Sequence, residues 1–179
     1  MGSDTSEEIL EATGSALCNH GYADLTMQRI AAESSITKAS IHYHYDTKEA
    51  LLNAFLDDLL DRFEERLAGE DRDPERRLES FLDAVFAPTK TGNDDFPIAL
   101  MELKAQAPYH DPFRNRFHDL DGAMRTVLAS IVRDGIDDGC FERADPEAVA
   151  RLVTTLTNGG HVRTVALGEP PEKTRDLIE

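Results

Sequence analysis

Hydroxyl, amine, imidazole and phenol groups lie close together in one part of this 179-residue chain. Thr37, Lys38 and Ser40 come first, and the run His42-Tyr43-His44 follows directly. Such side chains donate hydrogen bonds to phosphate oxygens and to base edges, and the lysine adds a positive charge. Because two histidines at i and i+2 on a helix point to different sides, His42 and His44 are not expected to share a metal ion.

No nucleophile motif, set of metal ligands or phosphate-cradling glycine loop accompanies these groups in the sequence. We therefore expect a protein that is not an enzyme, with no catalytic residues, no metal and no cofactor. The chemistry available to the segment is the binding of a polyanion.

Two short helices separated by a tight turn are predicted to position this segment. Thr26 is a good N-cap for a helix that reaches about Ser34, and Thr37 caps another that ends near Tyr45. Helices of this length bury little by themselves, so the spacing predicts a helix-turn-helix. The residues expected inside its corner are Ile30, Ile36 and Ile41.

The outer face of this motif supplies the candidate DNA contacts. The first turn of the second helix can reach base edges and phosphates in a major groove. Thr26 and Lys48 each open a helix, where free N–H groups favour a phosphate. The predicted DNA-binding residues are Thr26, Gln28, Thr37, Lys38, Ala39, Ser40, His42, Tyr43, His44 and Lys48.

The charge of the whole chain opposes DNA binding at low ionic strength. Asp and Glu number 35 against 19 Lys and Arg, a formal net charge of −16. In molar salt the Debye length shrinks to about 3 Å, so that only charges in contact matter. We interpret the composition as a salt-adapted surface that resembles those of proteins from halophilic microbes. From Thr26 to Lys48, by contrast, three basic residues outnumber two acidic ones.

The stretch from Thr26 to Leu52 resembles the signature of tetracycline-repressor-like (TetR-type) transcriptional regulators. The matching features are the opening Thr26, the Thr37-Lys38 pair, an aromatic run at residues 42–45 and the pair Lys48-Glu49. The resemblance implies DNA contacts at Thr26, Thr37, Lys38, Tyr43, His44 and Lys48, with Tyr45 as a packing aromatic. Three positions depart from the pattern, where Gly, Gly and Tyr are usual: Ser35, Ala39 and His42.

Apolar residues recur with a helical period along the rest of the chain, and no sustained alternation suggests a sheet. We expect an all-α protein, with an N-terminal three-helix helix-turn-helix domain at residues 1–50. A long fourth helix joins it to a helical bundle at 51–179, with a polar seam at 69–74. The first helix is expected to start at a Thr5–Glu8 capping box. Later helices are predicted at 48–67, 74–86, 96–107, 112–120, 123–139, 146–167 and from Pro171.

The resemblance implies that the C-terminal domain binds a small effector and a second copy of the chain. An aromatic and aliphatic cluster could line a pocket between helices, although a plain hydrophobic core is the alternative for each member. The predicted effector-binding residues are Phe81, Phe96, Leu100, Met101, Tyr109, Phe113, Phe117 and Met124.

A homodimer is expected through helices at 123–136 and 149–165, with a close approach at Gly159 and Gly160. Its partners are then double-stranded operator DNA and an effector whose binding alters the spacing of the two recognition helices, most simply releasing a repressor. Two other classes remain: a helical small-molecule-binding protein or enzyme using His110-Asp111, and an adaptor that binds protein without DNA.

The sequence also bears on the cellular compartment. No apolar run approaches the roughly 18 residues of a membrane span, and residues 1–8 are polar. Cys18 and Cys140 lack CxxC spacing, so we expect no disulfide or structural zinc. These features favour a cytoplasmic protein with no membrane partner.

Overall fold

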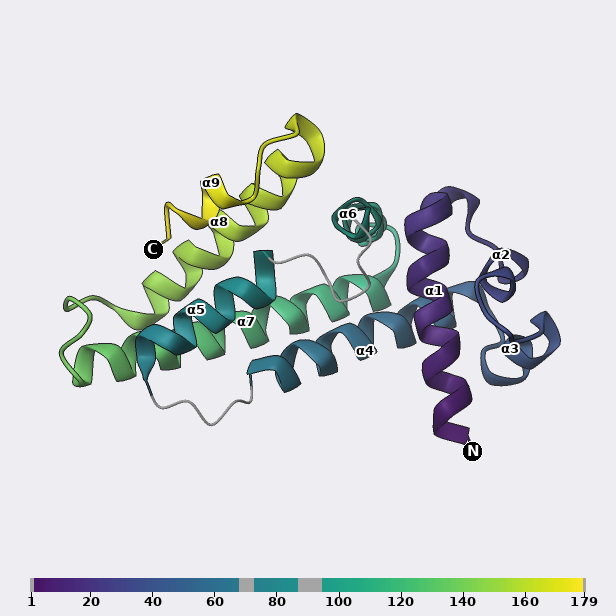
Figure 1. Cartoon of the computed structure of the whole chain (residues 1–179), viewed down its shortest axis with the longest axis horizontal. Coiled ribbons are helices and arrows are strands. Elements are labelled where there is room, and N and C mark those ends of the chain that lie inside the picture. The colour runs from purple at the N-terminus through teal and green to yellow at the C-terminus, as the bar shows by residue number, and fades with distance from the viewer. Residues whose placement is uncertain (1, 68–72, 87–94, 179) are drawn as a thin grey trace. The chain divides into compact units, whose positions relative to one another are not determined.

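The computed structural model of the chain describes residues 2–67, 73–86 and 95–178, and every regular element within them is a helix (Figure 1). The all-α prediction is confirmed. The expected seam at 69–74 lies mostly outside the described residues. The helices are α1 (Gly2–Asp24), α2 (Met27–Ala32), α3 (Lys38–His44), α4 (Lys48–Leu67), α5 (Pro74–Phe86), α6 (Phe96–Gln106), α7 (Asp111–Asp137), α8 (Pro146–Leu167) and α9 (Glu172–Arg175).

The chain forms two compact units, and each unit is made of two segments that are separated in the sequence. The first combines Met1–Leu60 with Pro88–Phe117, and the second combines Asp61–Ala87 with His118–Glu179. Helices α4 and α7 therefore contribute to both units, and α6 belongs with the N-terminal helices. The boundary at residue 50 remains a prediction about where the DNA-binding function ends.

The first unit has a core built by α1, α2, α3, α4, α6 and the start of α7. Apolar side chains at helical spacing on α1 meet those of the two short helices and of the first turns of α4. Ala99 and Leu103, one turn apart on α6, are buried in the same cluster and hold α6 against α1. The fully buried large side chains here are Ile9, Leu17, Ile30, Ile41, Leu51, Leu52, Leu103 and Phe113.

The second unit has a separate core, centred on Phe81 and Leu82 of α5. Leu128 and Ile131 of α7 and Val153 of α8 pack against them. Arginines fasten the helices at the rim. Arg77 of α5 lies 2.5 Å from the carboxylate of Asp134 and 3.2 Å from the hydroxyl of Ser130, both on α7. Arg175, just inside the end of α9, pairs with Asp83 of α5.

Two predicted helix boundaries are wrong. The segments 112–120 and 123–139 form the single helix α7, which runs through Gly122. An interior glycine costs about 1 kcal/mol, and burial of Met124 and Leu128 beyond it compensates for that cost. Helix α1 begins at Gly2, ahead of the proposed Thr5–Glu8 box, and the Glu8 carboxylate bonds to Ser35 instead of to the start of its own helix.

Both cysteines are free thiols. Cys18 is half-buried, and burial together with the nearby Asp95 carboxylate raises the pKa of its thiol. Cys140 is exposed. Within the described ranges, no helix combines the length and the apolar character needed to cross a membrane.

Candidate nucleic-acid interface

Threonine caps fix the two short helices of the motif. Thr26 and Thr37 have extended backbones, and each hydroxyl accepts a hydrogen bond at 3.2 Å from a backbone N–H three residues on, that of Arg29 and that of Ser40. Both N-caps predicted from the sequence are confirmed. A cap satisfies a backbone donor that the helix cannot satisfy itself, and it sets the residue at which each short helix begins.

The inside of the corner is apolar, as predicted. Ile30 and Ile41 are fully buried, and Ile36 in the turn packs against the same cluster. Because these three side chains fix the roll of α2 and α3, the opposite side of α3 faces outward. Tyr45, expected as a packing aromatic, is partly buried, and its hydroxyl lies 3.0 Å from that of Ser6 on α1.

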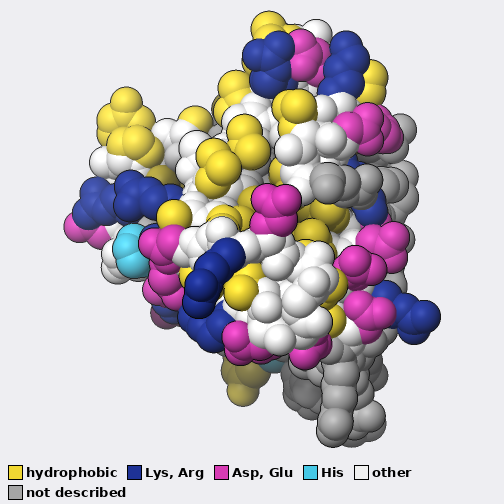
Figure 2. Space-filling model, turned by 90° about the vertical axis from the view of Figure 1, so that its left-hand side faces the viewer, with side chains coloured by type: hydrophobic (Ala, Val, Ile, Leu, Met, Phe, Trp, Pro, Cys, Tyr) yellow, Lys and Arg dark blue, Asp and Glu magenta, His cyan; other side chains and the backbone are white. Residues whose placement is uncertain are grey.

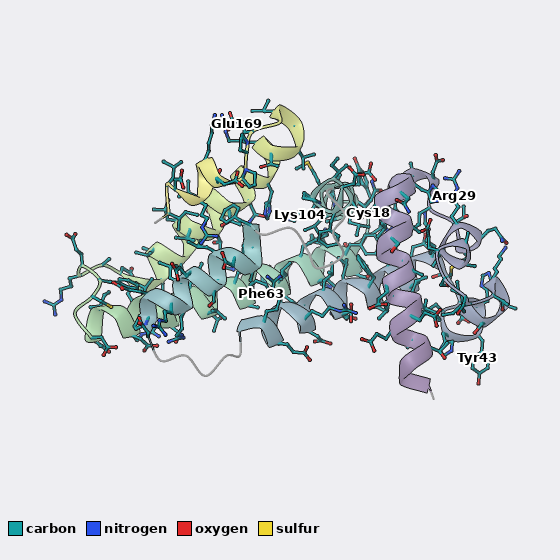
Figure 3. The ribbon with its side chains drawn as sticks, viewed as in Figure 1. Cys18, Arg29, Tyr43, Phe63, Lys104 and Glu169 are labelled. Atoms are coloured by element: carbon teal, nitrogen blue, oxygen red, sulfur yellow. The ribbon has the colours of Figure 1, made fainter. Side chains whose placement is uncertain are left out.

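The predicted DNA contacts lie on the outer side of this corner. Tyr43 is 87% exposed, and Figure 3 shows its side chain pointing away from the helices. Ser40 and Lys48 are partly buried. The exposed members of the predicted set are Thr26, Gln28, Thr37, Lys38, Ala39, His42, Tyr43 and His44.

The positively charged side chains of this surface differ in whether they already contact other groups of the chain. Arg29 donates to the Asp24 carbonyl oxygen at 2.8 Å and lies 3.5 Å from its carboxylate. The ammonium of Lys48 lies 3.4 Å from the Tyr22 carbonyl oxygen and 4.5 Å from the centre of its ring. Lys38 forms no ion pair within the part of the chain that the structure describes. Its charge is therefore available to a phosphate or a base edge.

Side chains outside the motif hold it in place, a role that residue types and spacing did not reveal. The Glu8 carboxylate of α1 accepts from the backbone N–H of Ser35 at 3.2 Å and from its hydroxyl at 2.7 Å. Asn19 of α1 donates to the Glu33 carboxylate at 3.1 Å. Ser35 stands where the related signature has glycine. In this chain the serine hydroxyl at that position bonds to Glu8. The turn is thereby tied to α1.

The predicted effector-binding residues are divided between the two cores. Phe113 is buried in the first core, and Phe96 and Phe117 pack against it. Phe81 and Met124 are buried in the second core. Leu100 and Met101 on α6 are partly buried, whereas the side chain of Tyr109 is 80% exposed. Their role as ligand contacts remains a prediction.

A hollow of about 310 Å³ lies on the second unit, at α7 and the start of α8. Polar and charged side chains dominate it, and none of the predicted effector residues lines it. Its lining residues are Gly122, Arg125, Thr126, Ala129, Arg133 and Glu147. Within the described residues, no group of three or more His, Cys, Asp or Glu side chains could hold a metal ion.

An all-helical chain whose capped, outward-facing second helix belongs to a helix-turn-helix has the architecture of a DNA-binding regulator. Residues 9–55 match the sequence profile of the bacterial regulatory proteins of the tetR family. Residues 74–179 match that of the BetI-type transcriptional repressor C-terminal region. The chain belongs to the TetR family and is a DNA-binding transcriptional regulator.

Solved structures of other regulators have the same fold. The crystal structure of a TetR transcription regulator from Haloarcula marismortui has a TM-score of 0.89 and 43% sequence identity, covering 98% of this chain and 95% of that one. A regulator from Saccharomonospora viridis in complex with choline shares the fold, with a TM-score of 0.85 at 20% identity over 98% and 94% of the two chains.

Curated relatives are more distant. The repressor KstR2 from Rhodococcus jostii is 25% identical over 75% of this chain, and the match spans 66% of the length of that protein. KstR2 from Mycobacterium tuberculosis is 24% identical over 84% of this chain and 76% of that protein.

Proposed function

We propose that the chain is a homodimeric repressor that holds operator DNA through the α3 helices of its two copies and releases it when a small effector binds. The outward placement of the first turn of α3 carries this proposal. Thr37 caps the helix, and Lys38 and Ala39 are exposed beside it. In such motifs the start of the second helix enters the major groove, and a two-fold dimer reads half-sites about 34–36 Å apart.

The side chains of this turn suggest what it reads. A lysine favours the O6 and N7 acceptors of guanine, whereas a small apolar residue such as Ala39 suits the methyl group of thymine. Ser40 can donate to or accept from a base edge. Tyr43 and His44, one turn further on, are placed for the flanking phosphates. We therefore expect guanine opposite Lys38 in each half-site.

Binding has to succeed despite a formal net charge of −16. Each phosphate contact that releases a counterion makes affinity fall as salt rises. With Lys38 as the exposed lysine of α3, we expect few such contacts and a shallow salt dependence. The test is operator affinity by fluorescence anisotropy from low to molar potassium chloride, with promoter DNA of neighbouring genes as the probe. A steep loss of affinity, or equal binding of scrambled DNA, contradicts the proposal.

The exposed side of α8 is the proposed dimer contact. Along it run the exposed residues Ala148, Leu152, Thr155, Gly159 and Val162, which are small or apolar, with Leu152 58% and Val162 53% exposed. A Cβ at Gly159 meets open space, so nothing within the chain requires glycine there. Gly160 differs, because its Cβ would lie 2.7 Å from the Thr174 side chain. The close approach expected there is made within the chain, by the segment around α9.

A charge placed on this stripe tests the dimer. Leu152→Glu is expected to shift the sedimenting species from dimer to monomer, because a carboxylate buried in an apolar interface costs several kcal/mol. Leu177→Glu is the matched control, since Leu177 is 74% exposed and lies off α8. A dimer that survives Leu152→Glu unchanged would remove α8 from the interface.

The effector is proposed to bind in the C-terminal half, with aromatic and methionine side chains as its contacts. Choline, which a regulator of the same fold holds, is a reasonable first probe because aromatic rings attract quaternary ammonium ions. Release of operator DNA on adding the probe supports control by a ligand of this class. Because its proposed target is operator DNA, the protein is proposed to act in the cytoplasm.

A further inference from the structure

The backbone of Tyr22, near the end of α1, is held from two sides by side chains of other helices. Gly21 has φ 70° and ψ 168°, which interrupts α1 just before Tyr22. A break in a helix leaves the following N–H groups without their usual acceptors four residues back. The N–H of Tyr22 instead donates to the Glu102 carboxylate of α6, with N and Oε2 2.6 Å apart.

Glycine at position 21 serves this contact in two ways. Its positive φ is a conformation that residues with a side chain rarely adopt. A Cβ added there would also lie 2.9 Å from Oε2 and 3.2 Å from Oε1 of Glu102. The carboxylate thus sits directly over the bare backbone of Gly21. The contact therefore depends on Gly21 as well as on Glu102. Glu102 and Tyr22 are 80 positions apart in the sequence.

The other side of Tyr22 is held by Lys48. Its ammonium donates to the Tyr22 carbonyl oxygen at 3.4 Å and lies 4.5 Å from the centre of the ring, a cation–π distance. Burial and the Glu49 carboxylate raise the pKa of the Tyr22 phenol, so the ring stays neutral. We call Tyr22, Lys48 and Glu102 the Tyr22 clamp.

The clamp joins an anion of α6 to the first residue of α4. Three residues separate Lys48 from the end of α3, and the Thr47 hydroxyl caps α4 by accepting from the Ala50 N–H at 3.0 Å. The junction between α3 and α4 is therefore tied through Tyr22 to α6. A shift of α6 by about one ångström breaks a 2.6 Å bond and leaves a partly buried N–H unsatisfied.

We propose that Glu102 is a positioning residue for DNA binding: through the Tyr22 backbone and Lys48 it fixes the α3–α4 junction, and displacement of α6 loosens that junction. Lys48 then acts mainly by holding this junction, rather than as an independent phosphate contact. The positioning role rests on DNA binding alone. Its use as the route of regulation rests on the proposed release by an effector.

Three variants of the full-length protein test the clamp: Glu102→Ala, Glu102→Gln and Lys48→Met. Glu102→Ala removes the acceptor, and we expect faster hydrogen exchange at the Tyr22 amide and about tenfold weaker operator binding. Glu102→Gln keeps a neutral acceptor and is expected to fall between Glu102→Ala and the native protein. Glu142→Gln removes one exposed negative charge elsewhere and should leave both measurements unchanged.

The double variant Glu102→Ala/Lys48→Met distinguishes positioning from separate roles. If the two residues act through Tyr22, Lys48→Met costs little further affinity once Glu102 is gone. The proposal would be overturned if the loss of operator affinity in the double variant equalled the product of the losses in the two single variants. It would also be overturned if the Tyr22 amide of Glu102→Ala exchanged at the native rate. Should Glu102→Ala fold poorly, the same cycle is run with Glu102→Gln. If the native protein binds no operator, the proposed function fails, whereas Tyr22 exchange still reports on the clamp.

Discussion

The α2–α3 corner and the second unit, which holds α5, α8 and α9, are both helical, yet they are specified over different distances along the chain. In the corner, each cap is closed within three residues, and the buried Ile30 and Ile41 lie 11 positions apart. In the second unit the helices are joined by the pairs Arg77 with Asp134 and Arg175 with Asp83, the latter 92 residues apart. Neighbouring residues thus set where the helices of the corner begin, whereas the second unit is held together by pairs that are far apart in the sequence.

The strongest way to test this difference is to damage one core and watch the other. Phe81→Ala empties a fully buried site of the second core and is expected to lower the free energy of unfolding by about 3–5 kcal/mol. Amide exchange should accelerate in α5, α7 and α8 before it does in α2 and α3. Leu177→Ala, at an exposed site, is the control. Equal acceleration in α2 and α3 would show that the two cores do not act separately.

The DNA-binding role of the α2–α3 corner is tested by Lys38→Ala. We expect operator affinity to fall by about 1–3 kcal/mol, with specificity relaxed at one base pair of each half-site. Lys173→Ala removes an exposed lysine of α9 and should leave affinity unchanged. Affinity is measured on operator variants with every base at that position. A uniform loss on all variants would make Lys38 a phosphate contact instead.

A smaller effect is expected from the cap of α3. Thr37→Ala removes the acceptor for the Ser40 N–H and should cost about 1 kcal/mol of stability. Urea unfolding measures the loss. Ser15→Ala, whose hydroxyl bonds back to the Glu11 carbonyl within α1, is the matched control. If both variants lose the same stability, capping is not what Thr37 contributes.

The smallest effect concerns the end of α8, where Arg163 and Glu169 form two hydrogen bonds of 2.7 and 2.5 Å. The hydrogen bond from Arg163 holds the pKa of the Glu169 carboxyl below its usual range. Its stabilising contribution is therefore present at neutral pH and is lost as the pH falls through that lowered pKa. Glu169→Gln should slightly reduce the fall of the melting temperature that accompanies a fall in pH. Glu172→Gln, on the exposed face of α9, should not.

The parts of the fold that could be predicted from sequence are those that local chemistry determines. Thr26 and Thr37 identified the start of each short helix, and the isoleucine spacing identified the inside of the corner. The start of α1 was predicted wrongly, because a Thr-x-x-Glu pattern does not reveal that Glu8 bonds to Ser35. Gly122 looked like a break because its cost is local, whereas the packing that offsets it comes from other helices.

The candidate site divides in the same way. The outward placement of Lys38 and Tyr43 follows from helical periodicity once the inner side chains are known. That Lys48 is engaged with Tyr22, and Tyr22 with Glu102, depends on how α1, α4 and α6 meet, which composition and spacing do not encode. The exposed Tyr109, which lies between Pro108 and His110, also shows that an aromatic residue close in sequence to apolar residues need not be buried.

Base-by-base protection of promoter DNA by the native protein, in concentrated potassium chloride, tests the central claim most directly. The claim is that two copies of α3, each led by Lys38, enter successive major grooves. It predicts two protected half-sites whose centres lie about 10 base pairs, or a multiple of that, apart. Protection that is absent, or that ignores sequence, would contradict it.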